Sequence, residues 1–90
     1  LKVWNAETGK IAVEIKPSHS DTVFGVCFSP DNTKLASCGA DKFVKVFEIP
    51  SGKFIKSFEG HTNHVMDVGW KSDGKLLASA GADNNVKIWD

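Results

Sequence analysis

The chain has 90 residues, enough for one small domain at most. Basic and acidic residues balance, so the formal net charge is zero. This balance argues against nucleic acid or an anionic membrane as the binding partner. No apolar stretch approaches the ~18 residues that a membrane-spanning helix needs. The chain begins without Met or a signal peptide, which we interpret as the mark of a piece of a longer protein.

Short runs of β-branched and aromatic residues alternate with turn residues along the whole chain. No segment shows a convincing helical period of 3.6 residues. The pattern predicts strands at residues 1–5, 10–15, 23–28, 34–39, 43–48, 53–58, 65–70, 75–80 and 85–89. A loop over residues 16–22 is marked by Pro17 and Ser18. We therefore predict an all-β fold in which antiparallel strands follow one another as a meander.

The sequence repeats itself after 42 residues. Residues 18–48 align with residues 60–90 without a gap, and the shared positions include a histidine, a Leu-Ala-Ser run and a Gly-Ala-Asp run. A further partial copy lies at the N-terminus, where Lys2–Trp4 matches Lys45–Phe47. A period of ~40–45 residues with Gly-His and Trp-Asp marks is the signature of a propeller blade.

The marks of the second copy are Gly60-His61, Ser79, Asp83 and Trp89-Asp90. With this spacing the whole chain resembles the WD-repeat β-propellers. The resemblance implies antiparallel four-stranded blades, with strands a to d counted outward from the centre. It implies that residues 23–58 make one complete blade. Residues 1–15 would then be strands c and d of the preceding blade, and residues 65–90 strands a to c of the following one.

The resemblance also implies a buried chain of hydrogen bonds from Trp through Ser and His to Asp, which ties the strands of a blade together. Each of these polar groups must find a partner when it is buried, and the carboxylate fixes the tautomer of the imidazole. In the second copy these hydrogen bonds would join Trp89, Ser79, His61 and Asp83. In the first copy they would join Ser37, His19 and Asp41. Phe47 replaces the tryptophan in the first copy and has no N–H to donate, so we expect that blade to be the weaker one.

A Ser-His-Asp set also has the composition of a hydrolytic triad. The same residue types recur at the same spacing in both copies, which favours a structural role because an active site rarely repeats in every blade. The spacing of His61 and His64 suggests a metal site, but Thr22 stands in the equivalent place of His64 and no Cys or acidic cluster joins them. No phosphate-binding glycine loop is present. We therefore expect no catalytic residue, metal or cofactor in this chain.

Two cysteines, Cys27 and Cys38, are too few for a disulfide framework. Their counterparts in the second copy are Gly69 and Ala80, so both occupy positions of small residues. Buried free thiols are the simplest interpretation, and a bridge across the hairpin between them is the alternative that geometry decides. Free thiols favour a reducing, cytoplasmic setting.

Partner binding is the function that the resemblance favours. Ligands of such propellers usually dock on the top face, which is built from loops and the starts of the inner strands. By position in the repeat this face comprises Thr22, Phe24, Ala40, His64, Met66 and Ala82. Phe24 and Met66 are equally compatible with a place in the core. We predict a non-catalytic scaffold for protein–protein interaction; the alternative is a targeting or regulatory propeller module of a larger enzyme.

Propellers close with roughly 4–8 blades, and a single repeat cannot bury its own faces. We therefore expect the remaining blades of the same propeller to be partners of this chain. Alone, the 90 residues should be marginally stable or prone to aggregation. Self-assembly of copies into a ring is the less favoured alternative, because strand c is present at both ends, at residues 1–5 and 86–90, and the two would compete for one place.

Overall fold

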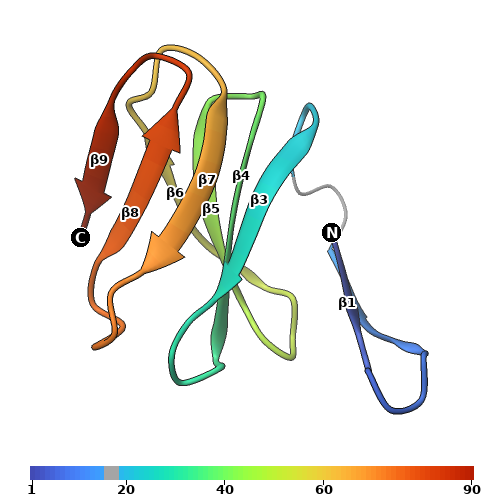
Figure 1. Cartoon of the computed structure of the whole chain (residues 1–90). Coiled ribbons are helices and arrows are strands. Elements are labelled where there is room, and N and C mark those ends of the chain that lie inside the picture. Colours follow the sequence, from blue (N-terminus) through green and yellow to red (C-terminus); the bar gives the residue numbers. More distant parts are fainter. Residues whose placement is uncertain (16–18) are drawn as a thin grey trace.

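The computed structural model describes residues 1–15 and 19–90, which contain strands and turns but no helix. The strands are β1 (Lys2–Trp4), β2 (Ile11–Glu14), β3 (Val23–Phe28), β4 (Lys34–Gly39), β5 (Phe43–Glu48), β6 (Phe54–Glu59), β7 (Val65–Trp70), β8 (Leu77–Gly81) and β9 (Val86–Trp89). They form three antiparallel sheets in sequence order, β1-β2, β3-β4-β5-β6 and β7-β8-β9 (Figure 1). The prediction of an all-β antiparallel meander is thus confirmed. Pro17 and Ser18, which mark the predicted loop, lie outside the described residues.

β6 and β8 begin later than the sequence pattern predicts because the residues predicted to open them close the preceding turn instead. The carbonyl of Lys53 accepts the N–H of Glu48 at 2.7 Å, so β6 begins one residue later, at Phe54. The carbonyl of Leu76 accepts the N–H of Lys71 at 2.9 Å, and β8 begins after it. The strands predicted at residues 1–5, 10–15 and 85–89 are also shorter in the structure.

Equivalent turn residues of the two copies have similar backbone φ angles. Asn32 has a φ of 63°, and its equivalent Gly74 has a φ of 74°. Lys42 and its equivalent Asn84 have φ values of 74° and 68°. Positive φ costs energy for residues with a Cβ, and Asn and Gly adopt it most readily. The two copies therefore share the shape of their turns even where the residue types differ.

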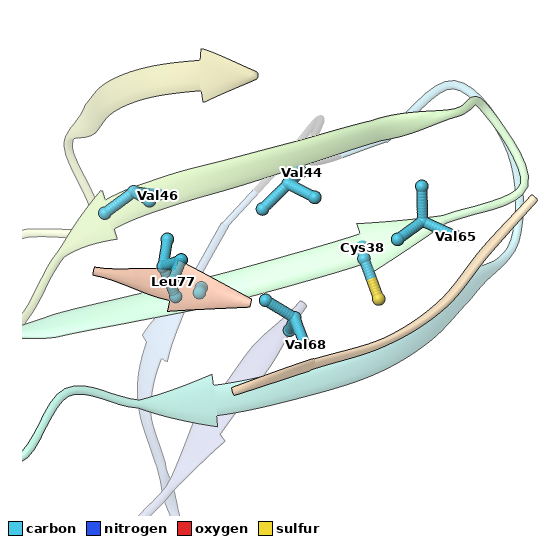
Figure 2. Close-up of a cluster of buried hydrophobic side chains, with 7 residues drawn as sticks. Cys38, Val44, Val46, Val65, Val68 and Leu77 are labelled. Carbon is cyan, nitrogen blue, oxygen red and sulfur yellow. The ribbon is translucent and has the colours of Figure 1, made fainter. Parts of the chain in front are cut away.

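The main core lies between the four-stranded sheet and the three-stranded sheet (Figure 2). The four-stranded sheet contributes Ala36, Cys38, Val44 and Val46, and the three-stranded sheet contributes Val65, Val68 and Leu77. On β4 and β5 these residues are two apart, as a strand that presents one face to a core requires. Figure 2 shows Val68 and Leu77 facing the side chains of Cys38, Val44 and Val46. Apolar packing thus holds the two sheets face to face.

A second, smaller cluster attaches the β1-β2 hairpin to the other face of the four-stranded sheet. It contains Val13, Ile15, Leu35 and Phe47, with Leu1, Val3 and Ile49 partly buried beside it. Leu35 and Phe47 alternate along their strands with Ala36 and Val46 of the main core, so they point to the opposite face. The four-stranded sheet therefore lies between the hairpin and the three-stranded sheet (Figure 1).

Both cysteines are free thiols. The strand register pairs Cys27 with Ala36 and Cys38 with Gly25, so the two thiols do not stand opposite each other. Burial of Cys38 in the main core, together with the negative charge of Asp67, raises the pKa of its thiol to about 11. Cys38 is therefore a packing residue with little thiolate character at neutral pH.

Candidate functional site

The second copy of the repeat contains a continuous hydrogen-bond chain. The indole N–H of Trp89 donates to the hydroxyl oxygen of Ser79 at 2.7 Å. Ser79 Oγ lies 2.7 Å from Nε2 of His61, whose Nδ1 lies 3.0 Å from a carboxylate oxygen of Asp83. When Nδ1–H donates to the carboxylate, Nε2 is free to accept the hydroxyl proton. The chain thus joins β9, β8, the segment before β7 and the turn after β8.

Asp83 is the last residue of this hydrogen-bond series, and the donors around its carboxylate favour the ionised form. Its carboxylate accepts the backbone N–H of Thr62 at 3.0 Å and that of Asn85 at 3.1 Å, besides the contact with His61. These interactions, the Thr62 N–H foremost, lower the pKa of Asp83 to about 2. Asp83 is therefore a charged anchor at neutral pH.

The first copy contains the same arrangement without its tryptophan. His19 Nε2 lies 2.7 Å from Ser37 Oγ, and His19 Nδ1 lies 2.9 Å from both carboxylate oxygens of Asp41. Burial disfavours the charge of Asp41, but the hydrogen bonds from His19 and from the N–H of Phe43 outweigh it and lower the pKa of this carboxyl. Phe47 is buried in the second cluster and packs edge-on against Phe54 at 5.9 Å between ring centroids. It offers no donor, so the chain ends at Ser37.

Neither serine is placed to act as a nucleophile. Ser79 is 1% exposed and Ser37 is completely buried, so no substrate carbonyl can approach either hydroxyl. A Cβ placed on Gly81 would lie 2.5 Å from His61 Nδ1, which shows how closely the backbone packs around the imidazole. Each set connects neighbouring strands through hydrogen bonds, and both serine hydroxyls are buried.

Contacts join five of the six residues expected at the top face in pairs. The N–H of Ala40 donates to the carbonyl of Thr22, and the N–H of Ala82 donates to the carbonyl of His64, both at 2.8 Å. The first bond places the turn at Ala40 beside the residue that precedes β3, and the second places the turn at Ala82 beside the residue that precedes β7. The rings of Phe24 and His64 contact each other, with centroids 5.5 Å apart.

Phe24 and Met66 occupy β-bulges at equivalent places of the two copies. The pairing of β3 with β4 shifts between Val23 and Gly25, and the pairing of β7 with β8 shifts between Val65 and Asp67. The intervening residue has no partner across the strand, and a bulge of this kind turns a side chain out of the sheet. Phe24 is 41% exposed and Met66 is 47% exposed, so neither belongs to the core. We call Phe24, His64 and Met66 the bulge patch.

One contact between the sheets was not found by sequence reasoning. The indole N–H of Trp70 donates to the backbone carbonyl of Cys27 at 3.1 Å and so joins β7 to β3. The repeat gave no signal for it, because the equivalent residue of Trp70 is Phe28, which has no N–H. Trp89 likewise packs on Phe58 of the neighbouring sheet, with ring centroids 5.1 Å apart.

Among the described residues, no group of three or more His, Cys, Asp and Glu side chains is arranged to hold a metal ion. The same part of the chain includes no helix of the length and apolarity that crossing a membrane requires.

Comparison with known proteins gives a consistent result. The family described as WD domain, G-beta repeat, matches residues 11–48 and 52–90. The chain is 34% identical to the nuclear distribution protein PAC1 of Komagataella phaffii over 76% of its length, and 37% identical to the human F-box-like/WD repeat-containing protein TBL1X over 76%. It is 37% identical to a coronin-like protein of Saccharomyces cerevisiae over 69% of its length. The chain covers only 14%, 11% and 9% of these three relatives, so it is similar to a small part of each.

Proposed function

Because the chain belongs to the WD-repeat family, we propose that it is a protein-interaction module that binds a protein or peptide through the bulge patch and performs no chemistry itself. The observation that carries the proposal is the pair of equivalent bulges. Each exposes a large apolar side chain at the start of an inner strand, and His64 contacts one of them. Exposed apolar side chains that gather in one place, with a polar group beside them, are typical of interaction sites.

The two Ser-His-Asp sets support the absence of catalysis. Both sets are buried and occur at the same spacing in two copies, as expected of structural connectors. In this proposal the strands within each blade are held together by the side chains of His19, Ser37, Asp41, His61, Ser79, Asp83 and Trp89. Their role in binding is indirect, because they fix the loops that carry the patch.

The three sheets correspond, in this proposal, to parts of successive blades. The four-stranded sheet is a complete blade, the β1-β2 hairpin is the outer half of the preceding blade, and β7, β8 and β9 are the inner three strands of the following one. Further sheets of the same kind would cover the two outer faces. The bulge patch then lies at the rim of a channel and is widened by equivalent residues of the other blades.

The test uses a peptide selected from a random displayed library against the immobilised chain, then synthesised with a fluorescent label. We expect Met66→Ser to weaken its binding by about tenfold or more, the loss typical of one apolar anchor. Ile55→Ser is the matched control, because Ile55 is 45% exposed on β6, outside the bulge patch. The proposal fails if no binder is selected, or if Met66→Ser and Ile55→Ser bind the peptide alike.

A further inference from the structure

The aspartate that follows Met66 lies between the two inner strands. Asp67 is exposed, and it comes directly after the bulge in β7. A Cβ placed on Gly25 of β3 would lie 3.2 Å from the Cα of Asp67 and 3.2 Å from its carboxylate oxygen Oδ1. Gly25 follows Phe24, and it is also the equivalent of Asp67 in the first copy. The carboxylate therefore rests against the β3 backbone next to Phe24, in space that a side chain on residue 25 would fill.

The packing around Gly25 gives this carboxylate a defined position. A Cβ on Gly25 would lie 3.0 Å from the Sγ of Cys38 as well, so β3, β4 and β7 meet closely at this glycine. The carboxylate belongs to the residue after one bulge and touches the residue after the other. A charged group that is already held in place loses little freedom when a ligand binds to it. Asp67 is thus a preformed part of the surface around the bulge patch.

The carboxylate of Asp67 retains most of its capacity to accept hydrogen bonds. Its Oδ1 accepts the N–H of Val68 at 2.8 Å, and Oδ2 has no hydrogen-bond partner among the described residues. The ion pairs that form within the described part of the chain do not include Asp67. A carboxylate offers about four acceptor positions. Asp67 can therefore accept further donors from a ligand.

The segments that carry the bulge patch have an excess of acidic residues. They are residues 20–25 and 40–42 of the first copy and the equivalent residues 62–67 and 82–84 of the second. Together they contain four aspartates and one lysine, although the formal net charge of the chain is zero. Asp41 and Asp83 are paired with histidines, whereas Asp21 and Asp67 are exposed. A surface with this balance of charge attracts a positively charged partner.

We propose that the bulge patch binds a peptide with a lysine or arginine side chain next to an apolar one, and that Asp67 selects the positive charge. The apolar side chain packs on Met66 and Phe24, and the ammonium or guanidinium group pairs with the Asp67 carboxylate. The ring of Phe24 offers the same cation a second favourable contact, because the face of an aromatic ring attracts positive charge. This selectivity rests on the proposed function, since it requires a ligand at the bulge patch.

Selection of peptides from the random displayed library against two forms of the full chain tests the proposal. Peptides selected on the unaltered chain should be enriched in lysine and arginine relative to the unselected library. Asp67→Asn removes the charge but keeps an oxygen that can accept the N–H of Val68, so peptides selected on it should lack this enrichment. Asp73→Asn is the matched control, because it removes the same charge from an exposed carboxylate in the turn between β7 and β8.

The labelled peptide selected on the unaltered chain then gives the size of the effect. We expect Asp67→Asn to weaken its binding by about fivefold, as the loss of one solvent-exposed ion pair does, and Asp73→Asn to leave it unchanged. Replacing the lysine or arginine of the peptide by glutamine should weaken binding to the unaltered chain by a similar factor. The same replacement should have no effect on binding to Asp67→Asn, because the two changes remove the same contact.

Two results would overturn selection by Asp67 and leave the proposed function standing. One is a selected peptide that needs Met66 but binds Asp67→Asn and Asp73→Asn alike. The other is a set of selected peptides without enrichment of lysine and arginine. By contrast, equal binding by Met66→Ser and Ile55→Ser, or the absence of any binder, would overturn the proposed function and the role of Asp67 together. Circular dichroism of each variant confirms that it keeps its strands.

Discussion

The residues that first suggest an active site are, in the structure, connectors between strands. Each histidine uses one ring nitrogen for a serine of the second strand of its sheet and the other for an aspartate in the following turn. Each imidazole thereby holds the segment before the first strand of its sheet against the second strand and the turn that follows it. Buried polar chains of this kind are stable only when every group has a partner. No buried side-chain nitrogen or oxygen in the described residues lacks one.

The two serines should differ in their contribution to stability. Ser79→Ala removes the partner of both His61 and Trp89, so we expect the free energy of unfolding to fall by about 2 kcal/mol. Ser37→Ala removes the partner of His19 alone and should cost about 1 kcal/mol. Urea unfolding followed by circular dichroism measures both. Equal losses would mean that the indole bond adds nothing to the second copy.

Asp83 should make the protein sensitive to acid. Its pKa is about 2 in the folded chain and close to 3.8 in the unfolded one. The unfolded chain therefore binds the proton first, so the stabilisation is complete above about pH 4 and is lost as the pH falls towards 2. Asp83→Asn should flatten the pH dependence of the melting temperature in this window. The dependence should not vanish, because the hydroxyls of Ser29 and Thr33 also hold the pKa of Asp31 at about 2. An unchanged slope would contradict the role of Asp83.

At the scale of the elements, the strand order and the all-β class could be predicted from sequence, since alternation and turn residues act locally. The bulges at Phe24 and Met66 could not, because a bulge depends on how one strand pairs with another. The sequence pattern was therefore equally compatible with a core position and a surface position for Phe24 and Met66. The same limit applies to Trp70, whose partner is a backbone carbonyl on a strand 43 residues away.

The hydrogen bond of Trp70 is the element-scale contact that we expect to matter most between β7 and β3. Trp70→Phe keeps an aromatic ring, as Phe28 does in the first copy, but removes the donor to the Cys27 carbonyl. We expect the free energy of unfolding to fall by about 1 kcal/mol, the net value of one such bond plus slight repacking. Urea unfolding of the two proteins decides this. A loss indistinguishable from zero would show that the two sheets are held by apolar packing alone.

The described residues expose apolar side chains on two sides of the main core. Val26 and Phe28 are exposed on β3 of the four-stranded sheet, and Val86 and Ile88 are exposed on β9 of the three-stranded sheet. Small chains with such limited burial are only marginally stable. The repeat in the sequence predicts this marginal stability, because a repeat unit buries its faces against its neighbours.

The 90 residues by themselves should therefore be marginally stable. We expect a broad transition at a low temperature, or aggregation on heating, because several large apolar side chains of the described residues are exposed. Thermal unfolding monitored by circular dichroism tests this expectation. A sharp, cooperative transition of the unaltered chain as a monomer, independent of concentration, would contradict the expected marginal stability.

The most direct test of the central claim is to map where the selected peptide binds by backbone amide chemical shifts. We predict the largest shifts at residues 22–24, 40, 64–66 and 82, with the amides of Val86 and Ile88 unchanged. Shifts confined to β9 or to the β1-β2 hairpin would contradict the assignment of partner binding to the bulge patch.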